Sequence, residues 1–543
     1  MPTKYIVVLG SLMSGLGKGV VTSSILKILD FYNIKALPIK FDGYLNYDCG
    51  TMNPYRHGEV FVLDDKSEVD MDFGLYERFL NKNLTGILSI TGGKLFGSVI
   101  RKERVGKYLG EDVQIIPHLT NEAITFIERV ANEEKPDVVV IEVGGTVGDI
   151  ENSYFIEAVR QFSLRNDTVF INLTYSPRME AVGEQKTKPA QLGFRLLLQA
   201  GIRPSFVICR SNDELPGNVK EKLALFANLE KERVIDDSDD ATIYNMPLHF
   251  MEQGLDRLLI KDLGLSDARL DKRRLGAWKE MVRRIVHPSA KVKIAVVGKY
   301  TGLRDSYASV KEALVHAAAS LDTGMEIRWI ESTELEKGDL SKLQDVDGIL
   351  VPGGFGNRGI EGMINAIQYA RENGKPYLGL CLGMQLMVVE YARNVALLKD
   401  ANSSEFSKRS RHKVIDLIYW QRGVKQKGGT MRLGAWECRL SGKDTIAYRA
   451  YGKPIISERH RHRYEFNNKY RSLLFKKGLV ISGTTKDNKL VEFVEWGSGF
   501  GIGTQAHPEL KSRLEAPAPL FVSFVKAASR AGIRNYSGNK RPD

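Results

Sequence analysis

The residues with the clearest chemical signature surround one cysteine. Residues 377–385 read YLGLCLGMQ, in which a short apolar strand leads into Cys381 and a helical stretch follows. The glycines permit the tight turn of a nucleophile elbow. At a helix N-terminus the thiolate, which is the nucleophilic form of cysteine, is favoured over the thiol. Taken alone, a buried structural cysteine is an equally good interpretation.

Two further segments favour catalysis. Residues 351–356 read VPGGFG directly after an apolar strand, and their backbone amides could donate to a developing oxyanion. Residues 505–509 read QAHPE, in which the proline favours an extended backbone at His507, so that Glu509 lies on the same face. His507, held by Glu509, could then serve Cys381 as base and acid. A plain turn and a chance His–Glu pair are the alternatives, but the three features together favour catalysis.

A second kind of chemistry is indicated near the N-terminus. Residues 10–19 read GSLMSGLGKG between a strand and a helix. Backbone N–H groups in such a loop cradle phosphates, and Lys18 can reach the terminal ones. The segment departs from the G-x-x-x-x-G-K-[ST] spacing, because residue 12 is leucine and Gly19 replaces the hydroxyl that binds magnesium. A glycine-rich turn without a ligand is the alternative.

Acidic residues lie where a magnesium ion would need them. Glu142 ends the apolar run 138–141, and Asp70 and Asp72 flank Met71. Mg²⁺ prefers carboxylate oxygens together with substrate phosphates. A solvated loop is the alternative for the two aspartates.

The elements that position these residues alternate between short apolar runs and helical stretches. This pattern predicts an α/β fold with mostly parallel sheets. Residues 264–292 break the pattern and are interpreted as a linker, and a second α/β pattern begins at residue 293. The predicted strands are 5–9, 36–39, 138–141, 169–173, 206–209, 293–297, 348–351 and 377–380, and helical spacing is found at 20–31 and 121–132.

Composition narrows the class of protein. Lys and Arg exceed Asp and Glu by 78 − 66 = 12, but the charge is spread along the chain, which favours small anions over nucleic acid or a membrane surface. The four cysteines form no C-x-x-C pair, so no zinc site or disulfide framework is predicted. Without a signal-peptide pattern or a membrane-length apolar run, a cytoplasmic protein is expected.

The back half, about residues 291–530, resembles a triad (class I) glutamine amidotransferase domain. The resemblance rests on the cysteine elbow, the glycine-rich segment 351–356 and the QAHPE segment. It implies Cys381 as the nucleophile that forms a glutamyl thioester, with His507 and Glu509 completing the triad. It also implies that the amides of Gly354 and Leu382 donate to the oxyanion.

Nearly the whole chain, about residues 4–530, resembles the CTP synthase family. The resemblance implies two three-layer α/β domains: a P-loop-type, dethiobiotin-synthetase-like synthetase domain at 1–266 and a glutaminase domain at 291–535. A linker at 267–290 and a flexible tail at 536–543 complete the expected organisation. The segments that carry the resemblance are 14–19, 50–54, 57–62, 143–151, 186–191, 428–434 and 459–464.

The resemblance also implies binding residues. ATP contacts map to Gly15, Leu16, Gly17, Lys18, Gly19, Asp72 and Asp240, and the metal ligands to Asp72 and Glu142. UTP and CTP contacts map to Ser14, Asp149, Ile150, Glu151, Lys186, Thr187, Lys188, Pro189, Ala190, Gln191 and Lys222. Glutamine contacts map to Gly354, Leu382, Gly383, Met384, Gln385, Glu405 and Arg463, and His57 is placed where ammonia enters.

The implied reaction is ATP-dependent amination of UTP to CTP through a 4-phosphorylated intermediate, with Mg²⁺ and with ammonia from L-glutamine. GTP as allosteric activator, CTP as feedback inhibitor, and a homotetramer that stacks into filaments are further implications. One alternative is an amidotransferase that activates a carboxylate, against which segments 149–151 and 186–191 speak. Another is a non-catalytic nucleic-acid-binding protein using residues 459–463, which lack interleaved stacking aromatics.

Overall fold

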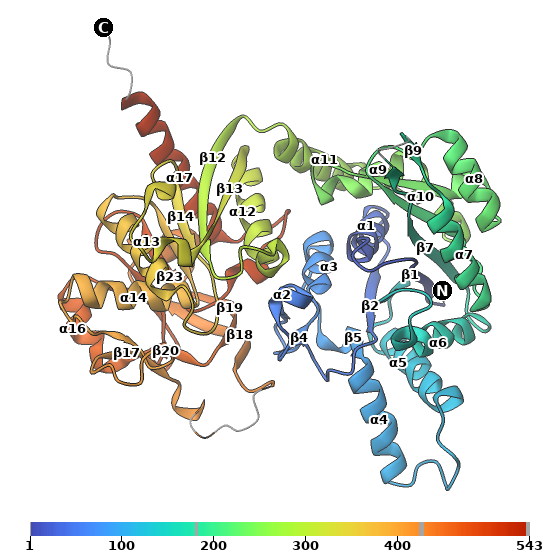
Figure 1. Cartoon of the computed structure of the whole chain (residues 1–543), viewed down its shortest axis with the longest axis horizontal. Coiled ribbons are helices and arrows are strands. Elements are labelled where there is room, and N and C mark those ends of the chain that lie inside the picture. Colours follow the sequence, from blue (N-terminus) through green and yellow to red (C-terminus); the bar gives the residue numbers. More distant parts are fainter. Residues whose placement is uncertain (1, 180–182, 422, 424–427, 539–543) are drawn as a thin grey trace. The chain divides into compact units, whose positions relative to one another are not determined.

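The computed structural model describes residues 2–179, 183–421, 423 and 428–538. The chain divides into two compact units (Figure 1). Unit 1 comprises Met1–Asp48 and Leu75–Val282, and unit 2 comprises Cys49–Gly74 and Arg283–Asp543. Unit 2 therefore includes a segment from inside the predicted range 1–266. Each unit has its own sheet and core.

Unit 1 is built on a seven-stranded, fully parallel sheet with the order β11-β10-β7-β1-β6-β2-β5. Its central strands are buried along nearly their whole length, as expected for a parallel sheet covered by helices on both faces. This confirms the predicted α/β class. The strands are β1 Lys4–Gly10, β2 Ala36–Asp42, β5 Ser89–Thr91, β6 Val138–Val143, β7 Thr168–Tyr175, β10 Phe206–Ser211 and β11 Val234–Ser238.

Helices alternate with these strands along the chain. Helix α1 packs on α9, α5 on α6, and α7 on α8. Trp278 of α11 is fully buried within unit 1 and donates to the carbonyl of Tyr244 at 2.8 Å. The helices are α1 Lys18–Phe31, α4 Gly92–Arg104, α5 Thr120–Glu134, α6 Ser153–Ser163, α7 Lys188–Gln199, α8 Gly217–Ala227, α9 Met246–Glu252, α10 Leu255–Asp262 and α11 Lys272–Val286.

Unit 2 contains a nine-stranded mixed sheet with the order β13-β12-β14-β15-β23-β22-β21-β18-β19. The first five strands are parallel, and from β23 onward neighbours are antiparallel. The strands are β12 Ala290–Gly298, β13 Thr323–Glu331, β14 Gly348–Val351, β15 Tyr377–Leu380, β18 Arg432–Leu440, β19 Ile455–His462, β21 Val480–Thr484, β22 Val491–Glu495 and β23 Gly501–Thr504.

Two hydrophobic cores cover the two faces of this sheet. One is formed with α13 and α14, and the other with α12, α15 and α17. Residues 539–543 of the predicted tail lie outside the described part of the chain. The helices are α12 Ala308–Ser320, α13 Ile360–Glu372, α14 Leu382–Asn394, α15 Ile446–Tyr451, α16 Arg471–Lys476 and α17 Pro519–Gly538, and a small sheet consists of β16 Asn402–Ser403, β17 Lys413–Leu417 and β20 Tyr464–Phe466.

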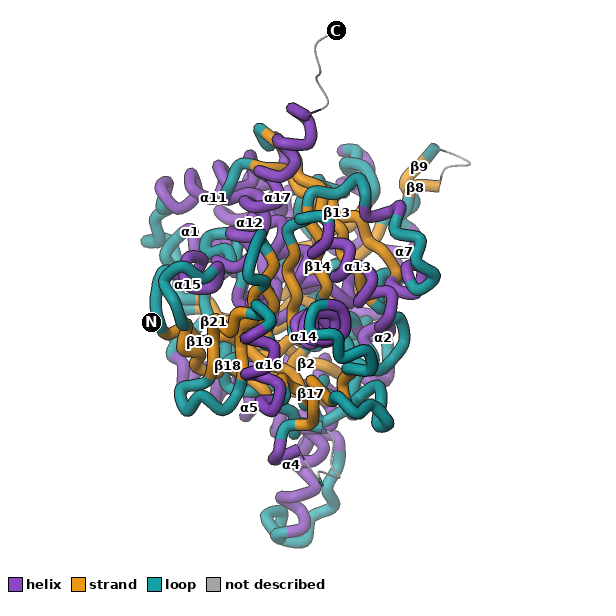
Figure 2. The backbone as a smooth tube through the Cα atoms, turned by 90° about the vertical axis from the view of Figure 1, so that its left-hand side faces the viewer, coloured by secondary structure: helices purple, strands orange, loops and turns teal. Residues whose placement is uncertain are grey.

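Short elements complete the fold. A hairpin of β8 Arg178–Met179 and β9 Glu184–Gln185 stands outside the main sheet of unit 1 (Figure 2). In unit 2, α2 Pro54–His57 precedes the hairpin of β3 Phe61–Val62 and β4 Glu68–Val69, and α3 Asp72–Leu80 leads back to unit 1. No helix among the described residues is long and apolar enough to cross a membrane.

Candidate active site

Cys381 lies at a sharp turn between β15 and α14. Its backbone is held at φ +50°, which is unusual for a residue with a side chain, and its N–H donates to the carbonyl of Thr504 at 2.7 Å. The turn needs glycine next to it, because a Cβ at Gly383 would lie 2.1 Å from the carbonyl oxygen of Val351. The cysteine is therefore presented at the N-terminus of a 13-residue helix.

His507 and Glu509 form a close pair beside the cysteine. Nδ1 of His507 lies 2.7 Å from Oε1 of Glu509, whose side chain is 3% exposed. Burial disfavours the imidazolium, but the charge of Glu509 and the sulfur of Cys381 outweigh it and raise the pKa of His507 well above its usual value. The pair forms in a tighter turn than expected, since a 3₁₀ helix begins at Pro508.

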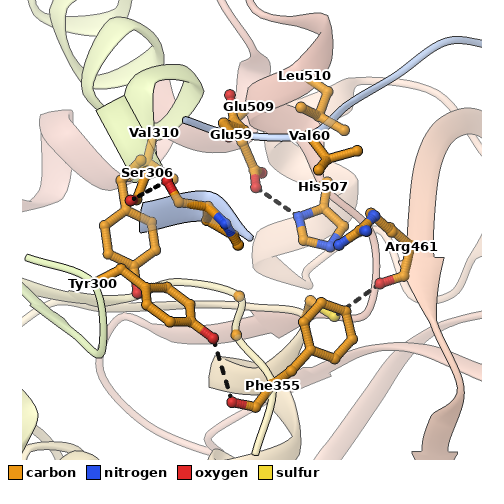
Figure 3. Close-up of a pocket in the computed structure, with 15 residues that line it drawn as sticks. Glu59, Val60, Tyr300, Ser306, Val310, Phe355, Arg461, His507, Glu509 and Leu510 are labelled. Atoms are coloured by element: carbon orange, nitrogen blue, oxygen red, sulfur yellow. Dashed lines mark hydrogen bonds and ion pairs between the residues drawn. The ribbon is translucent and has the colours of Figure 1, made fainter. Parts of the chain in front are cut away.

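All three residues line one cavity of unit 2. Figure 3 shows the imidazole of His507 and the carboxylate of Glu509 facing each other, with Phe355 and Arg461 nearby. The strap 353–356 borders the cavity and approaches the imidazole closely, because a Cβ at Gly353 would lie 2.8 Å from Cε1 of His507. The three segments singled out in the sequence thus meet at one place.

The strap is held by a buried lysine and a half-buried glutamate. Lys299 donates through Nζ to the carbonyl of Gly356, whose own N–H donates to Oε1 of Glu405 at 3.1 Å. Burial lowers the pKa of Lys299 to about 8 and raises that of Glu405. Lys299 carries no recognisable sequence signal, and only its packing against the strap reveals it.

The other predicted glutamine contacts lie on several elements. Gly354 packs against Leu382, as a Cβ on Gly354 would be 3.4 Å from Cδ2 of that leucine. Gln385 lies on the first turn of α14, with Gly383 and Met384. Arg463, between β19 and β20, donates to Oε1 of Gln421 at 2.5 Å and to Oγ1 of Thr430 at 3.0 Å.

Three cavity-lining residues come from the segment 49–74. They are Pro54, Glu59 and Val60, which lie in segments that carry the family resemblance but for which the sequence predicted no place at the glutaminase site. The N–H of Ser309, near the start of α12, donates to Glu59 at 3.1 Å and so fixes this segment. His57 itself is exposed and is not among the residues that line the cavity.

The predicted phosphate loop lies at the carboxyl end of β1 in unit 1. Gly15 and Gly17 have φ of +78° and +95°, conformations that side-chain-bearing residues rarely adopt. Lys18 begins α1 with Gly19 and donates to the carbonyl of Gly145 at 2.6 Å. The loop therefore borders the segment that follows β6, the strand that contains Glu142.

Glu142 is completely buried and doubly engaged. Its Oε1 lies 2.5 Å from Nζ of Lys40, and its Oε2 accepts from the hydroxyl of Tyr76 at 2.5 Å. Asp72, the other predicted metal ligand, begins α3 and belongs to unit 2. Among the described residues no group of three or more His, Cys, Asp or Glu could hold a metal ion alone.

The predicted UTP contacts lie on several segments of unit 1. Asp149 accepts from the N–H of Thr146 at 3.1 Å, and Val147 donates to the carbonyl of Gly10 at 2.8 Å. A pocket lies between the loop at Asp149–Ile150 and the carboxyl end of α7, where Leu196 and Gln199 line it, and residues 186–191 are not among its lining residues. Glu151 and Ser14 are exposed, Lys186 is half-buried, and Thr187, Ala190 and Gln191 are buried near Pro189.

Two predicted contacts lie farther along the sheet. A hydrogen bond from Lys186 lowers the pKa of Glu184 on β9, and the charges of Lys186 and of Lys222 on α8 lower it further, which places both lysines near this strand. Asp240 follows β11 and accepts from Nδ2 of Asn245 at 2.6 Å.

Comparison with known proteins defines the class of protein first. Residues 303–527 match the family model of the class I glutamine amidotransferases, and residues 4–265 match that of the CTP synthase N-terminus. A CTP synthase from Carboxydothermus hydrogenoformans is 52% identical over 533 residues, covering 97% of this chain and 98% of the relative. A CTP synthase from Methanocaldococcus jannaschii is 46% identical, covering 97% and 98%. The chain belongs to the CTP synthase family.

One solved structure is also similar in sequence. It is the glutaminase domain of CTPS from Trypanosoma brucei with bound acivicin, which is 41% identical. The match covers 44% of this chain and 94% of that chain, with a TM-score of 0.42.

Proposed function

We propose that this chain aminates UTP to CTP at the expense of ATP, using ammonia that it releases from glutamine. The observation that carries the glutaminase step is that Cys381, at the head of α14, shares one cavity with the His507–Glu509 pair. Family membership supports UTP as the acceptor. The same family supports a cytoplasmic enzyme.

In the glutaminase step the Cys381 thiolate attacks the amide carbon of glutamine. His507 gives its proton to the departing ammonia, and the thioester is then hydrolysed by a water that His507 deprotonates. The carboxylate of Glu509 stabilises the imidazolium. The amides of Gly354 and Leu382 are proposed to stabilise the oxyanion, while Glu405 and Arg463 suit the charged ends of the amino acid.

In the synthetase step ATP phosphorylates the uracil O4, which is a poor leaving group until it carries phosphate. Ammonia then attacks C4 and phosphate leaves. Lys18, which borders the segment after β6, and Lys40, which pairs with Glu142, are proposed to offset the charge of the transferring group. Ammonia must travel unprotonated, since ammonium is not a nucleophile, so a water-poor route is expected.

The binding roles follow the resemblance. We propose that the loop Gly15–Gly19 and Asp240 hold ATP. The lysines at 186, 188 and 222 are proposed to anchor the triphosphate of UTP or of the product. Ser14, Thr187, Pro189–Gln191 and the exposed loop Asp149–Glu151 would complete that site. His57 stays a predicted contact for ammonia entry.

A divalent cation, expected to be Mg²⁺, would neutralise phosphate charge in this step. Glu142 fits such a role, because it is a buried carboxylate beside the phosphate loop and Mg²⁺ is usually bound by one or two carboxylates plus substrate phosphates. For Glu142 to bind the cation, Lys40 or Tyr76 would have to release the Glu142 oxygen that it contacts. Asp72 remains the second predicted ligand.

Regulation and assembly are proposed on the family resemblance alone. They comprise activation by GTP, feedback inhibition by CTP, a homotetramer and its filaments.

The test follows the absorbance change as UTP becomes CTP, with ATP, Mg²⁺ and either glutamine or ammonia. We expect the native chain to use both nitrogen sources and Cys381→Ala to use ammonia alone. Glutamine hydrolysis without CTP from either source would reject UTP as the acceptor and favour a carboxylate-activating amidotransferase.

A further inference from the structure

The side chain of Gln505 touches the sulfur of the nucleophile. Gln505 follows β23, is fully buried, and its Nε2 lies 3.5 Å from Sγ of Cys381. Its N–H donates to the carbonyl of Glu492 on β22 at 2.9 Å, which anchors the backbone to the sheet. The triad mechanism assigns no role to this residue, because the base is His507, two residues farther along the chain.

The orientation of this amide is determined by a short chain of hydrogen bonds. The carbonyl of Tyr464 can only accept, so Gln385 must turn its Nε2 toward that oxygen, at 2.8 Å. The second hydrogen on this Nε2 then points to Oε1 of Gln505, at 3.2 Å. With its oxygen engaged, Gln505 can present only its N–H₂ group to the sulfur.

The opposite orientation of Gln505 would be unfavourable at both ends. It would bring two N–H₂ groups together at Gln385 and would place a carbonyl oxygen against an anionic sulfur. Gln385 is completely fixed by the same argument, because both of its amide hydrogens are used within the chain. If Gln385 contacts the substrate, it can do so only as an acceptor, through its Oε1.

We propose that Gln505, oriented by Gln385 and the Tyr464 carbonyl, is a positioning residue that donates a hydrogen bond to the Cys381 thiolate and holds the sulfur toward the substrate amide carbon. This deepens the proposed glutaminase function and rests on it. Because the site is buried, a donor to a charged sulfur is more effective here than in water. The hydrogen bond stabilises the thiolate before it attacks. It also fixes the direction from which the sulfur approaches the substrate amide carbon.

The test is the pH dependence of Cys381 alkylation by iodoacetamide, followed by mass spectrometry of the peptide that contains this cysteine. Gln505→Met keeps the length of the side chain but removes the donor. The midpoint is the pH at which the alkylation rate is half its maximum, and we expect it to lie about one to two pH units higher in this variant than in the native chain. We also expect its glutaminase kcat to fall about 10- to 100-fold, which is the range for the loss of one hydrogen bond to a charged group. Gln344→Met, on the exposed surface of unit 2, is the matched control and should leave both unchanged.

A second variant covers the case in which Gln505→Met does not fold. Gln505→Glu has the same shape but faces the sulfur with a carboxylate, so its midpoint should rise at least as far. A profile that superimposes on the native one for a folded variant would overturn the proposal. Alkylation needs no turnover, so a native chain without glutaminase activity would reject the proposed function while the profile still tested Gln505.

Discussion

Replacing Glu509 by glutamine removes one charge from the candidate triad and preserves its shape. Oε1 of Glu509 lies 2.7 Å from the imidazole of His507, and the two side chains are 3% and 14% exposed. Among the described residues, the other carboxylate oxygen of Glu509 has no hydrogen-bond partner, so its charge is balanced chiefly by the imidazolium. Loss of a buried charged hydrogen bond costs about 2–4 kcal/mol. We therefore expect glutamine-dependent kcat/KM to fall about 30- to 1,000-fold.

The pH profile supplies a more specific signature. In the native chain Glu509 and Cys381 raise the pKa of His507 well above its usual value, so the imidazolium persists to higher pH. Without the Glu509 charge this pKa falls, and the proton is lost at lower pH. The alkaline limb of the glutaminase profile should consequently move toward lower pH in Glu509→Gln.

The assay compares glutamine-dependent and ammonia-dependent CTP formation across pH. Glu336→Gln, the same substitution at an exposed position of unit 2, is the control and should match the native chain in both. A loss of less than about threefold together with an unmoved alkaline limb would refute the assigned role of Glu509, since one buried hydrogen bond to a charge is worth more than that.

Two further outcomes are expected. Burial raises the pKa of Glu465 to about 8, so the folded chain binds a proton that the unfolded chain releases between about pH 4.5 and 8, and stability falls as pH rises through this window. Glu465→Gln should therefore be more stable than the native chain at pH 8.5, on the order of 2–4 kcal/mol, and show little difference at pH 5. An equal difference at both values, measured by thermal unfolding, would contradict the assigned ionisation. Lys18→Met should reduce CTP formation about 100-fold or more with either nitrogen source, because it removes the charge that we propose to meet the ATP phosphates at the loop. The same change at exposed Lys261 should have no effect, and near-native turnover by Lys18→Met would exclude that role.

Local sequence was sufficient where one turn carries the chemistry. The alternation of strand and helix predicted the elbow at Cys381, because its glycines and apolar strand lie within nine residues of one another. The same holds for the loop that follows β1 and ends at Lys18, the first residue of α1. Such features depend on backbone conformations that neighbouring residues dictate.

Residues that act through distant contacts were not predictable in this way. Lys299 and Gln505 gain their positions from the strap and from the amide of Gln385, which lie 57 and 120 residues away. The polar contact of Gln505 with sulfur exists only once β23 has paired with β15. No local pattern distinguishes these side chains from ordinary buried polar ones.

The sequence by itself determined the two α/β patterns, the types of the reacting groups and the family to which the chain belongs. Only the tertiary structure decided that the segment 49–74 joins unit 2 and brings Pro54, Glu59 and Val60 to the cavity of Cys381. The physical reason is a set of long-range ion pairs and a helix cap. Arg459 lies 2.6 Å from Asp64, Arg461 lies 2.8 Å from Glu68, and Glu59 accepts from the first turn of α12. These partners lie nearly 400 residues apart in the chain, so no local pattern in the sequence indicates that they pair.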